Sequence, residues 1–276
     1  MKPIVLTDRV IIITGGSSGI GKATALVCAK AKMRVVIAAR REDELQALAA
    51  QIENDGGQAL AVVCDVTRDE DVTALITRTV EAFGRLDVMF ANAGYGYFSR
   101  VLETSAQAQR DIFETNFFGT VRCIEAAVPV MRETSDRGHV LICSSAASEI
   151  AVPMYGYYSA TKAAQDSIGG ALRAELHTQG IMVSTVHPIG TRTGFFDTVR
   201  TMSPDAGDGL STPDAMMQTP EKVAALVLRC LRRPTAEVWP SVVTRFVLAL
   251  TTAMPTLSAW VIRRMMLNKY ENNTET

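Results

Sequence analysis

Short apolar runs alternate with helical patterns along most of this chain, and this alternation constrains its fold more than any other feature. Six runs have the length and apolar content of buried strands, at residues 10–13, 34–39, 58–64, 86–91, 139–143 and 181–186. Stretches rich in helix formers separate them, the first ending near residue 32 and the others covering 42–54, 69–83, 106–133 and 155–179. Continuous apolar strands that alternate with helices indicate a parallel sheet covered on both faces. The sequence therefore predicts an α/β fold with a doubly wound, Rossmann-like sheet in a three-layer αβα sandwich.

The rest of the pattern predicts one domain with two additions. No internal repeat or linker divides the 276 residues, so we expect a single dinucleotide-binding and catalytic domain at 1–240. Within it, residues 197–218 have no regular period and are interpreted as a substrate lid, because long irregular segments in compact domains are usually binding loops. A last strand is expected around 237–239, followed by an apolar C-terminal helical extension at 241–276.

A glycine-rich segment, TGGSSGIG at residues 14–21, follows the first predicted strand and opens the first predicted helix. Glycines allow the chain to turn tightly and let a pyrophosphate approach the backbone. The free N–H groups at the start of the helix favour an anion. We therefore predict that this segment binds a dinucleotide.

Tyr158 and Lys162 are four residues apart in a predicted helix, so both side chains lie on one face. A free tyrosine has a pKa of about 10 and is a slow acid or base at neutral pH. A nearby ammonium group stabilises the phenolate and lowers that pKa. The pair is typical of general acid–base catalysis with tyrosine as the proton donor.

These motifs together resemble the short-chain dehydrogenase/reductase family, over the region from the first strand to about Thr193. The glycine segment follows the family spacing TGxxxGxG, Asn92-Ala93-Gly94 matches its NAG motif, and Thr193 lies where the family carries PGxxxT, although Ile189 replaces its glycine. The resemblance implies a catalytic set of Asn116, Ser145, Tyr158 and Lys162. It also implies a cofactor-binding set of Gly15, Ser17, Ser18, Gly19, Ile20, Asp65, Asn92, Gly94, Tyr158, Lys162 and Thr193. In this family Ser145 would hold the substrate oxygen, and Asn116 would hold a water in the proton path.

The end of the second predicted strand indicates which nicotinamide cofactor is used. NAD enzymes of this fold carry an acid there that binds the ribose 2′-hydroxyl. Here the sequence is Ala38-Ala39-Arg40-Arg41, and a guanidinium can bind a 2′-phosphate by charge-assisted hydrogen bonds. We predict NADP as the cofactor, with Arg40 as the favoured contact.

The resulting prediction is an NADP-dependent oxidoreductase that acts on a carbonyl or secondary alcohol. A non-catalytic NADP(H)-binding sensor or scaffold is the alternative, and an epimerase or dehydratase stays open. An apolar or lipid-like substrate would suit a pocket walled by aromatic and methionine side chains, which could equally be core or lid residues: Tyr97, Phe98, Met154, Phe195, Phe196, Met202, Met216 and Met217. His187 is interpreted as structural, no metal site is expected, and the net charge of −1 argues against a nucleic-acid partner.

The residues 242–266 are apolar, but Pro255 divides them into pieces too short to span a bilayer. Three alternatives stay open for this apolar surface: a cover over the substrate pocket, an interface between subunits, or contact with a membrane surface. The resemblance implies a homodimer or homotetramer. The five cysteines have no metal-binding or disulfide pattern and are interpreted as buried, reduced thiols of a cytoplasmic protein, which could also be membrane-associated.

Overall fold

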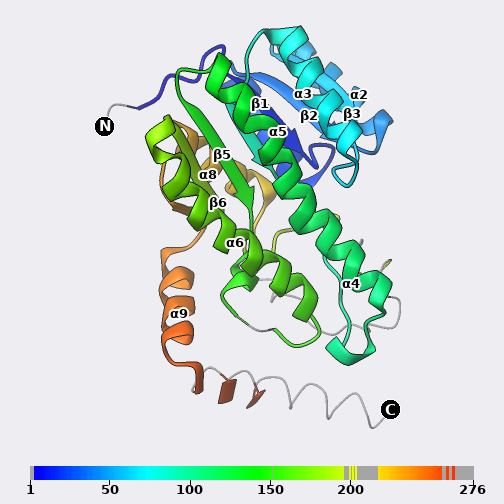
Figure 1. The fold of residues 1–276 in the computed structure, drawn as a ribbon, viewed down its shortest axis with the longest axis vertical. Coiled ribbons are helices and arrows are strands. Elements are labelled where there is room, and N and C mark those ends of the chain that lie inside the picture. The colour runs from blue at the N-terminus through cyan, green and yellow to red at the C-terminus, as the bar shows by residue number, and fades with distance from the viewer. Residues whose placement is uncertain are drawn as a thin grey trace.

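The computed structural model describes residues 3–150, 152–195, 199, 201, 203, 217–256, 259–260 and 263–264. Its centre is a seven-stranded parallel sheet in the order β3-β2-β1-β4-β5-β6-β7 (Figure 1). The strands are β1 Val10–Thr14, β2 Arg34–Ala39, β3 Gln58–Val63, β4 Val88–Ala91, β5 Gly138–Cys143, β6 Ile181–Val186 and β7 Glu237–Val238. The chain order reverses direction between β1 and β4, as in a doubly wound fold. The predicted fold is confirmed, including the short last strand.

Helices cover both faces of the sheet because successive side chains of a strand point to opposite sides. The helices are α1 Gly19–Lys30, α2 Glu42–Asn54, α3 Asp69–Phe83, α4 Ala106–Phe113, α5 Gly119–Thr134, α6 Gly156–Leu176, α8 Pro220–Arg232 and α9 Val242–Ala253. In β1, Ile11 and Ile13 pack in the core beneath α1, α2 and α8. Val10 and Ile12 pack in the opposite core, against α3 and α5. Both faces of each central strand are therefore dry, which explains the continuous apolar runs.

One expected helix is interrupted. The stretch 106–133 divides into α4 and α5, with a π-helical turn at Glu114–Phe118 between them. The turn places Asn116 inward, where its side-chain amide donates to the carbonyl of Tyr95 (2.9 Å) and to the hydroxyl of Thr161 (3.2 Å). Pro129 lies within α5, which continues to Thr134.

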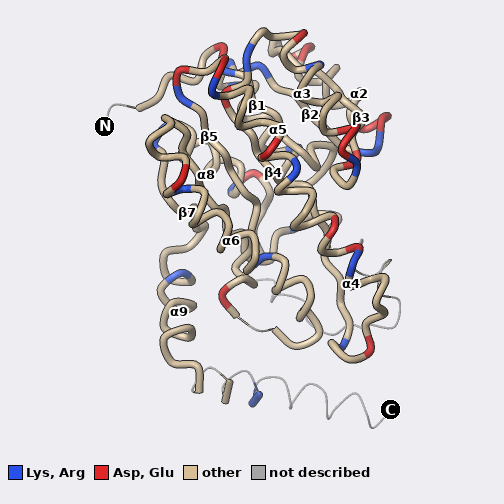
Figure 2. The backbone as a smooth tube through the Cα atoms, viewed as in Figure 1, with Lys and Arg blue, Asp and Glu red and all other residues tan. Residues whose placement is uncertain are grey.

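The C-terminal part begins with α9, which projects from the rest of the molecule and carries few charges (Figures 1 and 2). Its exposed apolar residues are Val242, Val243, Phe246, Val247 and Leu250. Among the described residues, no helix is long and apolar enough to cross a membrane. The division at residue 240 stays a prediction, and of the predicted lid 197–218 all but residues 199, 201, 203, 217 and 218 lie outside the described part.

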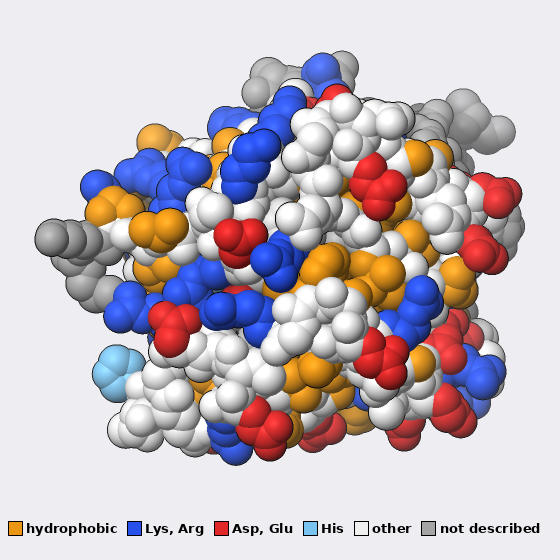
Figure 3. Space-filling model, turned by 90° about the horizontal axis from the view of Figure 1, so that it is seen from above, with side chains coloured by type: hydrophobic (Ala, Val, Ile, Leu, Met, Phe, Trp, Pro, Cys, Tyr) orange, Lys and Arg blue, Asp and Glu red, His pale blue; other side chains and the backbone are white. Residues whose placement is uncertain are grey.

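The end of the molecule that carries the amino ends of the strands has charges of both signs, interspersed with small apolar patches (Figure 3). Arg9 and Arg85 pair there with the buried carboxylate of Asp87, at 3.1 and 2.6 Å. The Arg9–Asp87 pair joins the start of β1 to the segment before β4. Lys and Arg are more frequent in the left half of this view, and Asp and Glu toward its right and lower edges.

Candidate active site

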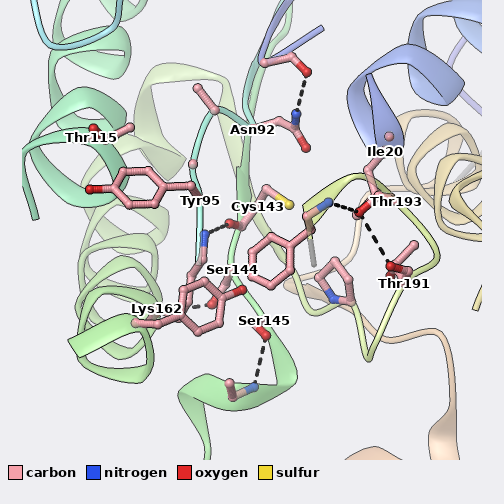
Figure 4. Close-up of a pocket in the computed structure, with 18 of the residues that line it drawn as sticks. Ile20, Asn92, Tyr95, Thr115, Cys143, Ser144, Ser145, Lys162, Thr191 and Thr193 are labelled. Carbon is pink, nitrogen blue, oxygen red and sulfur yellow. Dashed lines mark hydrogen bonds between the residues drawn. The ribbon is translucent and has the colours of Figure 1, made fainter. Parts of the chain in front are cut away.

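A cavity of about 800 Å³ lies at the carboxyl ends of the strands. Loops that follow the six strands β1 to β6 line it, together with Thr244 and Leu248 of α9. Figure 4 shows part of this lining, including Asn92, Ser145 and Thr193. The predicted site residues that line it are Gly15, Ser17, Ser18, Gly19, Ile20, Arg40, Asp65, Asn92, Gly94, Ser145, Tyr158, Lys162 and Thr193. Asn116 lies behind the cavity wall. Residues from seven segments of the chain thus meet where the parallel fold brings its strand ends together.

The glycine turn forms one end of the cavity. Gly15 and Gly19 have φ angles of +63° and +53°, which residues other than glycine rarely adopt. A Cβ on Gly21 would lie 2.3 Å from the carbonyl oxygen of Gly15, so the turn and α1 pack too closely for any side chain. The N-cap Ser18 makes no side-chain capping bond and the first turn of α1 holds no acid. The helix therefore directs unneutralised N–H groups at the cavity, as a phosphate site requires.

Two predicted cofactor residues support this turn from behind. The Asn92 side-chain amide donates to the carbonyls of Thr14 (2.9 Å) and Gly15 (3.3 Å). Thr193, after β6, accepts from the N–H of Phe195 (3.2 Å), and a Cβ on Gly19 would lie 2.9 Å from its methyl group. The loops after β1, β4 and β6 are therefore held together.

The arginines after β2 both line the cavity, and both are exposed. Arg41 donates to the hydroxyl of Ser17 (3.0 Å) and pairs with Glu44 (3.1 Å), so the structure attaches it to the glycine turn. The sequence favoured Arg40 as the cofactor contact, and this choice stays a prediction, because both arginines line the cavity. Nothing in the spacing could have chosen between them, because the chain leaves the strand at this point and side-chain direction depends on the loop.

Tyr158 forms the opposite end of the cavity, where β5 ends and α6 begins. Its side chain is 9% exposed and meets the ring of Phe195 edge-on, at 5.5 Å between centroids. Burial raises the pKa of the phenol, and the hydrogen bond with the Ser145 hydroxyl lowers it. The Ser145 oxygen accepts from the N–H of Ala147 (3.1 Å), which fixes that hydroxyl at the end of β5. Ser145 and Tyr158 are thus side by side, as their spacing predicted.

Lys162 lies one turn further along α6. Its ammonium donates to the carbonyl of Cys143 (2.7 Å; Figure 4) and lies 5.6 Å from the centre of the Tyr158 ring. Burial lowers the pKa of this ammonium. The positive charge is therefore held beside the phenol without a carboxylate in hydrogen-bonding contact among the described residues. This arrangement can stabilise a phenolate.

Asn116 contributes through its backbone. Its side chain is used in holding Tyr95, whose N–H donates to Asn116 Oδ1 (2.9 Å). The Asn116 carbonyl accepts from the side-chain amide of Gln165 (2.6 Å) and from the hydroxyl of Thr120 (2.8 Å). Gln165 also accepts from Lys162 (3.0 Å). Sequence reasoning missed Gln165, although its position three residues after Lys162 on α6 could have indicated it.

His187, which the sequence interprets as structural, is a buried side chain. Its ring stacks on Trp239 at 4.1 Å, and Nε2 lies 2.9 Å from the Thr185 hydroxyl. Nδ1 lies 3.7 Å from the carboxyl of Asp166, whose pKa is raised to about 6 by burial. Glu149 lies near both, and the three residues offer atoms within 4.8 Å of one another. This cluster is separate from the residues that line the cavity.

Of the residues proposed as an apolar wall, Phe195 lines the cavity. Phe98 is buried against Tyr155, at 5.0 Å between ring centroids, and Tyr155 itself lines the cavity. The proposed wall residues Phe196, Met202 and Met216 lie outside the described part of the chain. Ile189, which replaces the family's glycine, is part of the cavity lining.

This chain is similar to known proteins in sequence and in fold. The model of the short chain dehydrogenase family matches residues 9–204. Dehydrogenase/reductase SDR family member 7B of Xenopus tropicalis is 31% identical over 237 residues, which cover 82% of this chain and 75% of that protein. An A-factor type gamma-butyrolactone 1′-reductase (1S-forming) of Streptomyces virginiae is 33% identical over 223 residues, covering 80% of this chain and 87% of that protein.

Solved structures share the fold. A short chain dehydrogenase/reductase from Burkholderia phymatum, in complex with NAD, superposes with a TM-score of 0.82 at 24% identity, covering 92% of this chain and 96% of that one. A short-chain type dehydrogenase/reductase from Mycobacterium marinum gives a TM-score of 0.75 at 28% identity, covering 84% and 93%.

Proposed function

Because this chain belongs to the short-chain dehydrogenase family, whose members are oxidoreductases that bind a nicotinamide dinucleotide, we propose that it transfers a hydride between NADP(H) and a carbonyl or secondary alcohol. One observation carries the proposal: Ser145, Tyr158 and Lys162 meet at one end of a cavity whose other end is a glycine turn with open N–H groups. The glycine turn can bind the phosphates of a cofactor, and the group of Ser145, Tyr158 and Lys162 can transfer a proton. A non-catalytic sensor would bind the cofactor without needing this proton-transfer group.

The residues of the cavity fit a dinucleotide. Gly15, Ser17, Ser18, Gly19 and Ile20 would hold the pyrophosphate, because their glycines leave the backbone accessible. Asp65, Asn92 and Gly94 also line the cavity. A Cβ on Gly94 would lie 3.0 Å from Asn116 Oδ1 and 3.6 Å from Lys162 Nζ, so glycine lets this loop pack closely on both side chains.

The preference for NADP rests on this chain's own residues. The Burkholderia structure contains NAD, but the end of β2 here carries Arg40 and Arg41 in place of an acid. Arg41, tied to Ser17, is well placed for a 2′-phosphate, and Arg40 lines the same cavity. A phosphate would receive charge-assisted hydrogen bonds, whereas a ribose hydroxyl would find no carboxylate acceptor at the strand end.

The proposed chemistry divides between the cofactor and the protein. The cofactor supplies or accepts the hydride at the carbonyl carbon. In reduction, the phenolic O–H of Tyr158 breaks and its proton forms the new O–H of the alcohol, and in oxidation the phenolate takes that proton back. Ser145 donates to the same substrate oxygen and fixes it against the phenol. Lys162 stabilises the phenolate that Tyr158 becomes.

We propose an apolar substrate, because Ile150, Val152, Tyr155, Phe195 and Leu248 line the cavity, and the ring centroids of Tyr155 and Phe195 lie 5.9 and 5.5 Å from that of Tyr158. The test is a panel of aldehydes and ketones, from small polar to long-chain, assayed with NADPH by the loss of its absorbance. Turnover should be found, and kcat/KM should rise with apolar surface. Tight NADPH binding without turnover on any carbonyl would favour the sensor instead.

The proposal extends to partners and location. We propose a homodimer or homotetramer in the cytoplasm, with α9 covering the cavity through Thr244 and Leu248. The outward apolar face of α9 would then contact a second subunit or a membrane surface. A chain truncated after Pro240 should show a raised KM for apolar carbonyls and an unchanged Kd for NADPH, since the glycine turn is retained.

The same truncated chain separates the alternatives for the outer face. Loss of oligomeric mass supports an interface between subunits. Loss of co-sedimentation with anionic liposomes supports membrane contact. An unchanged KM would contradict the cover over the cavity.

A further inference from the structure

The side-chain amide of Gln165 lies between two groups assigned to the proton path. Gln165 is on α6, one turn after Lys162, and is 0% exposed. Its Oε1 accepts from the Lys162 ammonium at 3.0 Å. Its Nε2 donates to the backbone carbonyl of Asn116 at 2.6 Å and to the Thr120 hydroxyl at 2.7 Å. One amide therefore joins Lys162 to the interior of the π-helical turn.

The chemistry of its partners fixes the orientation of this amide. An ammonium can only donate and a backbone carbonyl can only accept, so the amide oxygen must face Lys162 and the amide nitrogen must face Asn116. The Thr120 hydroxyl gives its hydrogen to the Asn116 carbonyl at 2.8 Å, which leaves its lone pairs for the Gln165 N–H. All three hydrogen-bond partners therefore require the same orientation of the Gln165 amide.

The family resemblance implies a water on the Asn116 carbonyl, between it and the lysine. In this chain the amide of Gln165 already bonds that carbonyl and that ammonium. The Asn116 residue is 0% exposed and Lys162 is 5% exposed. The link that a water would make is therefore made by a side chain.

We propose that Gln165 is a positioning residue that holds the Lys162 ammonium beside Tyr158 by linking it directly to the Asn116 carbonyl. This inference rests on the proposed roles of Tyr158 and Lys162. An ammonium has three N–H donors; Cys143 and Gln165 take two of them, and the third is left for the cavity that Lys162 lines. With its direction fixed on two sides, the charge stays where it stabilises the phenolate.

The other titratable groups near this pair do not replace that link. Lys162 is influenced by the Cys143 thiol of β5 and the Asp166 carboxyl of α6. Tyr158 is influenced by Cys143 and Tyr155, besides its hydrogen bond with Ser145. None of these groups accepts a side-chain hydrogen bond from Lys162 among the contacts of the described residues. Loss of Gln165 should therefore loosen the ammonium and raise the pKa of the Tyr158 phenol.

Two substitutions separate a positioning role from a packing role. Gln165→Met keeps the length of the side chain but cannot bond Lys162 or Asn116, and it leaves no room for a water. Gln165→Ala frees space of the order of the ~30 Å³ that a water occupies, so a water can restore the link. We expect kcat to fall at least about tenfold in Gln165→Met and to fall less in Gln165→Ala. A packing role predicts the opposite order, because methionine preserves volume better than alanine.

The pH dependence of alcohol oxidation gives the second readout. The pH at half-maximal rate should rise by roughly one unit or more in Gln165→Met, because the phenolate loses a fixed neighbouring charge. The variant Gln165→Glu keeps an acceptor for Lys162 but offsets its charge, so its midpoint should also rise. If Gln165→Met does not fold, the pH at half-maximal rate of Gln165→Glu is the measurement used. An unchanged pH midpoint in the folded variants would overturn the proposal.

The controls distinguish this proposal from the proposed function. Gln179→Leu changes an exposed glutamine after α6 and should leave kcat, the pH midpoint and the NADPH Kd unchanged. NADPH Kd should also stay within about twofold in the Gln165 variants. A Tyr158→Phe variant that keeps turnover contradicts the proposed function. An inactive Tyr158→Phe variant, combined with wild-type pH profiles for the Gln165 variants, contradicts the positioning role alone.

Discussion

Burial favours the neutral forms of both Tyr158 and Lys162, since it raises the pKa of the phenol and lowers that of the ammonium. Hydrogen bonds act against this effect at each side chain. The Ser145 hydroxyl favours the phenolate, and the Cys143 carbonyl and Gln165 amide favour the ammonium. The charges needed for proton transfer are therefore supported by fixed dipoles of the protein.

The two arginines after β2 give a test of cofactor choice at this scale. Arg41→Ala and Arg40→Ala should each weaken NADPH binding more than NADH binding, because the lost charge faces the 2′-phosphate. Each charge-assisted bond contributes about 1.5–3 kcal/mol, so the NADPH Kd should rise by roughly tenfold or more. Fluorescence titration of both cofactors provides the measurement. Equal losses for NADPH and NADH would refute the assignment, and a wild-type preference for NADH would refute the cofactor.

The glycine segment, the Tyr158–Lys162 pair and the family resemblance together predicted residues that line the cavity, because most of these residues follow strands whose ends meet. Sequence reasoning failed where a contact joins distant segments. Gln165 bonds the Asn116 carbonyl across 49 residues of sequence, and only the packing of α6 on the π-helical turn brings them together. The catalytic role of Asn116 stays a prediction, and the structure adds that its side chain bonds the backbone of Tyr95.

Alanine substitutions at two adjacent glycines of α6 test how this helix packs on β6. A Cβ on Gly169 would lie 2.7 Å from the Thr185 methyl group of β6, whereas a Cβ on Gly170 meets nothing within 4 Å. Gly169→Ala should lower the free energy of unfolding by about 1–3 kcal/mol through overpacking. Gly170→Ala should raise it by about 0.5–1 kcal/mol through helix propensity.

Urea denaturation of both variants measures these differences. Similar changes for the two substitutions would show that α6 does not pack on β6 in this register.

Periodicity predicted the strands and most helices within a few residues, because both faces of the sheet are covered and the strands are continuously apolar. The interruption between α4 and α5 could not be predicted, since a π-helical turn adds one residue without changing the amphipathic pattern enough to notice. It is stabilised by tertiary bonds from Asn116 rather than by local sequence preference.

For the whole molecule, a buried histidine makes stability depend on pH. Burial lowers the pKa of His139 in β5 to about 4, and its Nε2 lies 2.9 Å from the Ser184 hydroxyl. An unfolded histidine has a pKa of about 6.5, so between these values the unfolded state binds the additional proton. The contribution of His139 to the free energy of unfolding is therefore fully present above about pH 6.5. It falls by roughly 3 kcal/mol as the pH is lowered toward 4.

His139→Asn should show a shallower loss of unfolding free energy between pH 6.5 and 4 than the wild type. Asp166, with its carboxyl pKa raised to about 6 by burial, contributes the opposite slope in part of this range, so the comparison must be between variant and wild type. His177→Asn, on an exposed turn, serves as the control and should retain the wild-type slope. Equal slopes for all three proteins would contradict the buried, neutral His139.

The central claim for the molecule is that one cavity binds NADP(H) at the glycine turn and moves a proton through Tyr158 at the other end. Turnover of Tyr158→Phe, measured beside its NADPH Kd, tests this most directly. We predict that kcat falls at least about a hundredfold, because the variant lacks the general acid, while the NADPH Kd changes little. A variant that keeps more than about a tenth of wild-type kcat would lose under about 1.4 kcal/mol of transition-state stabilisation and would contradict the claim.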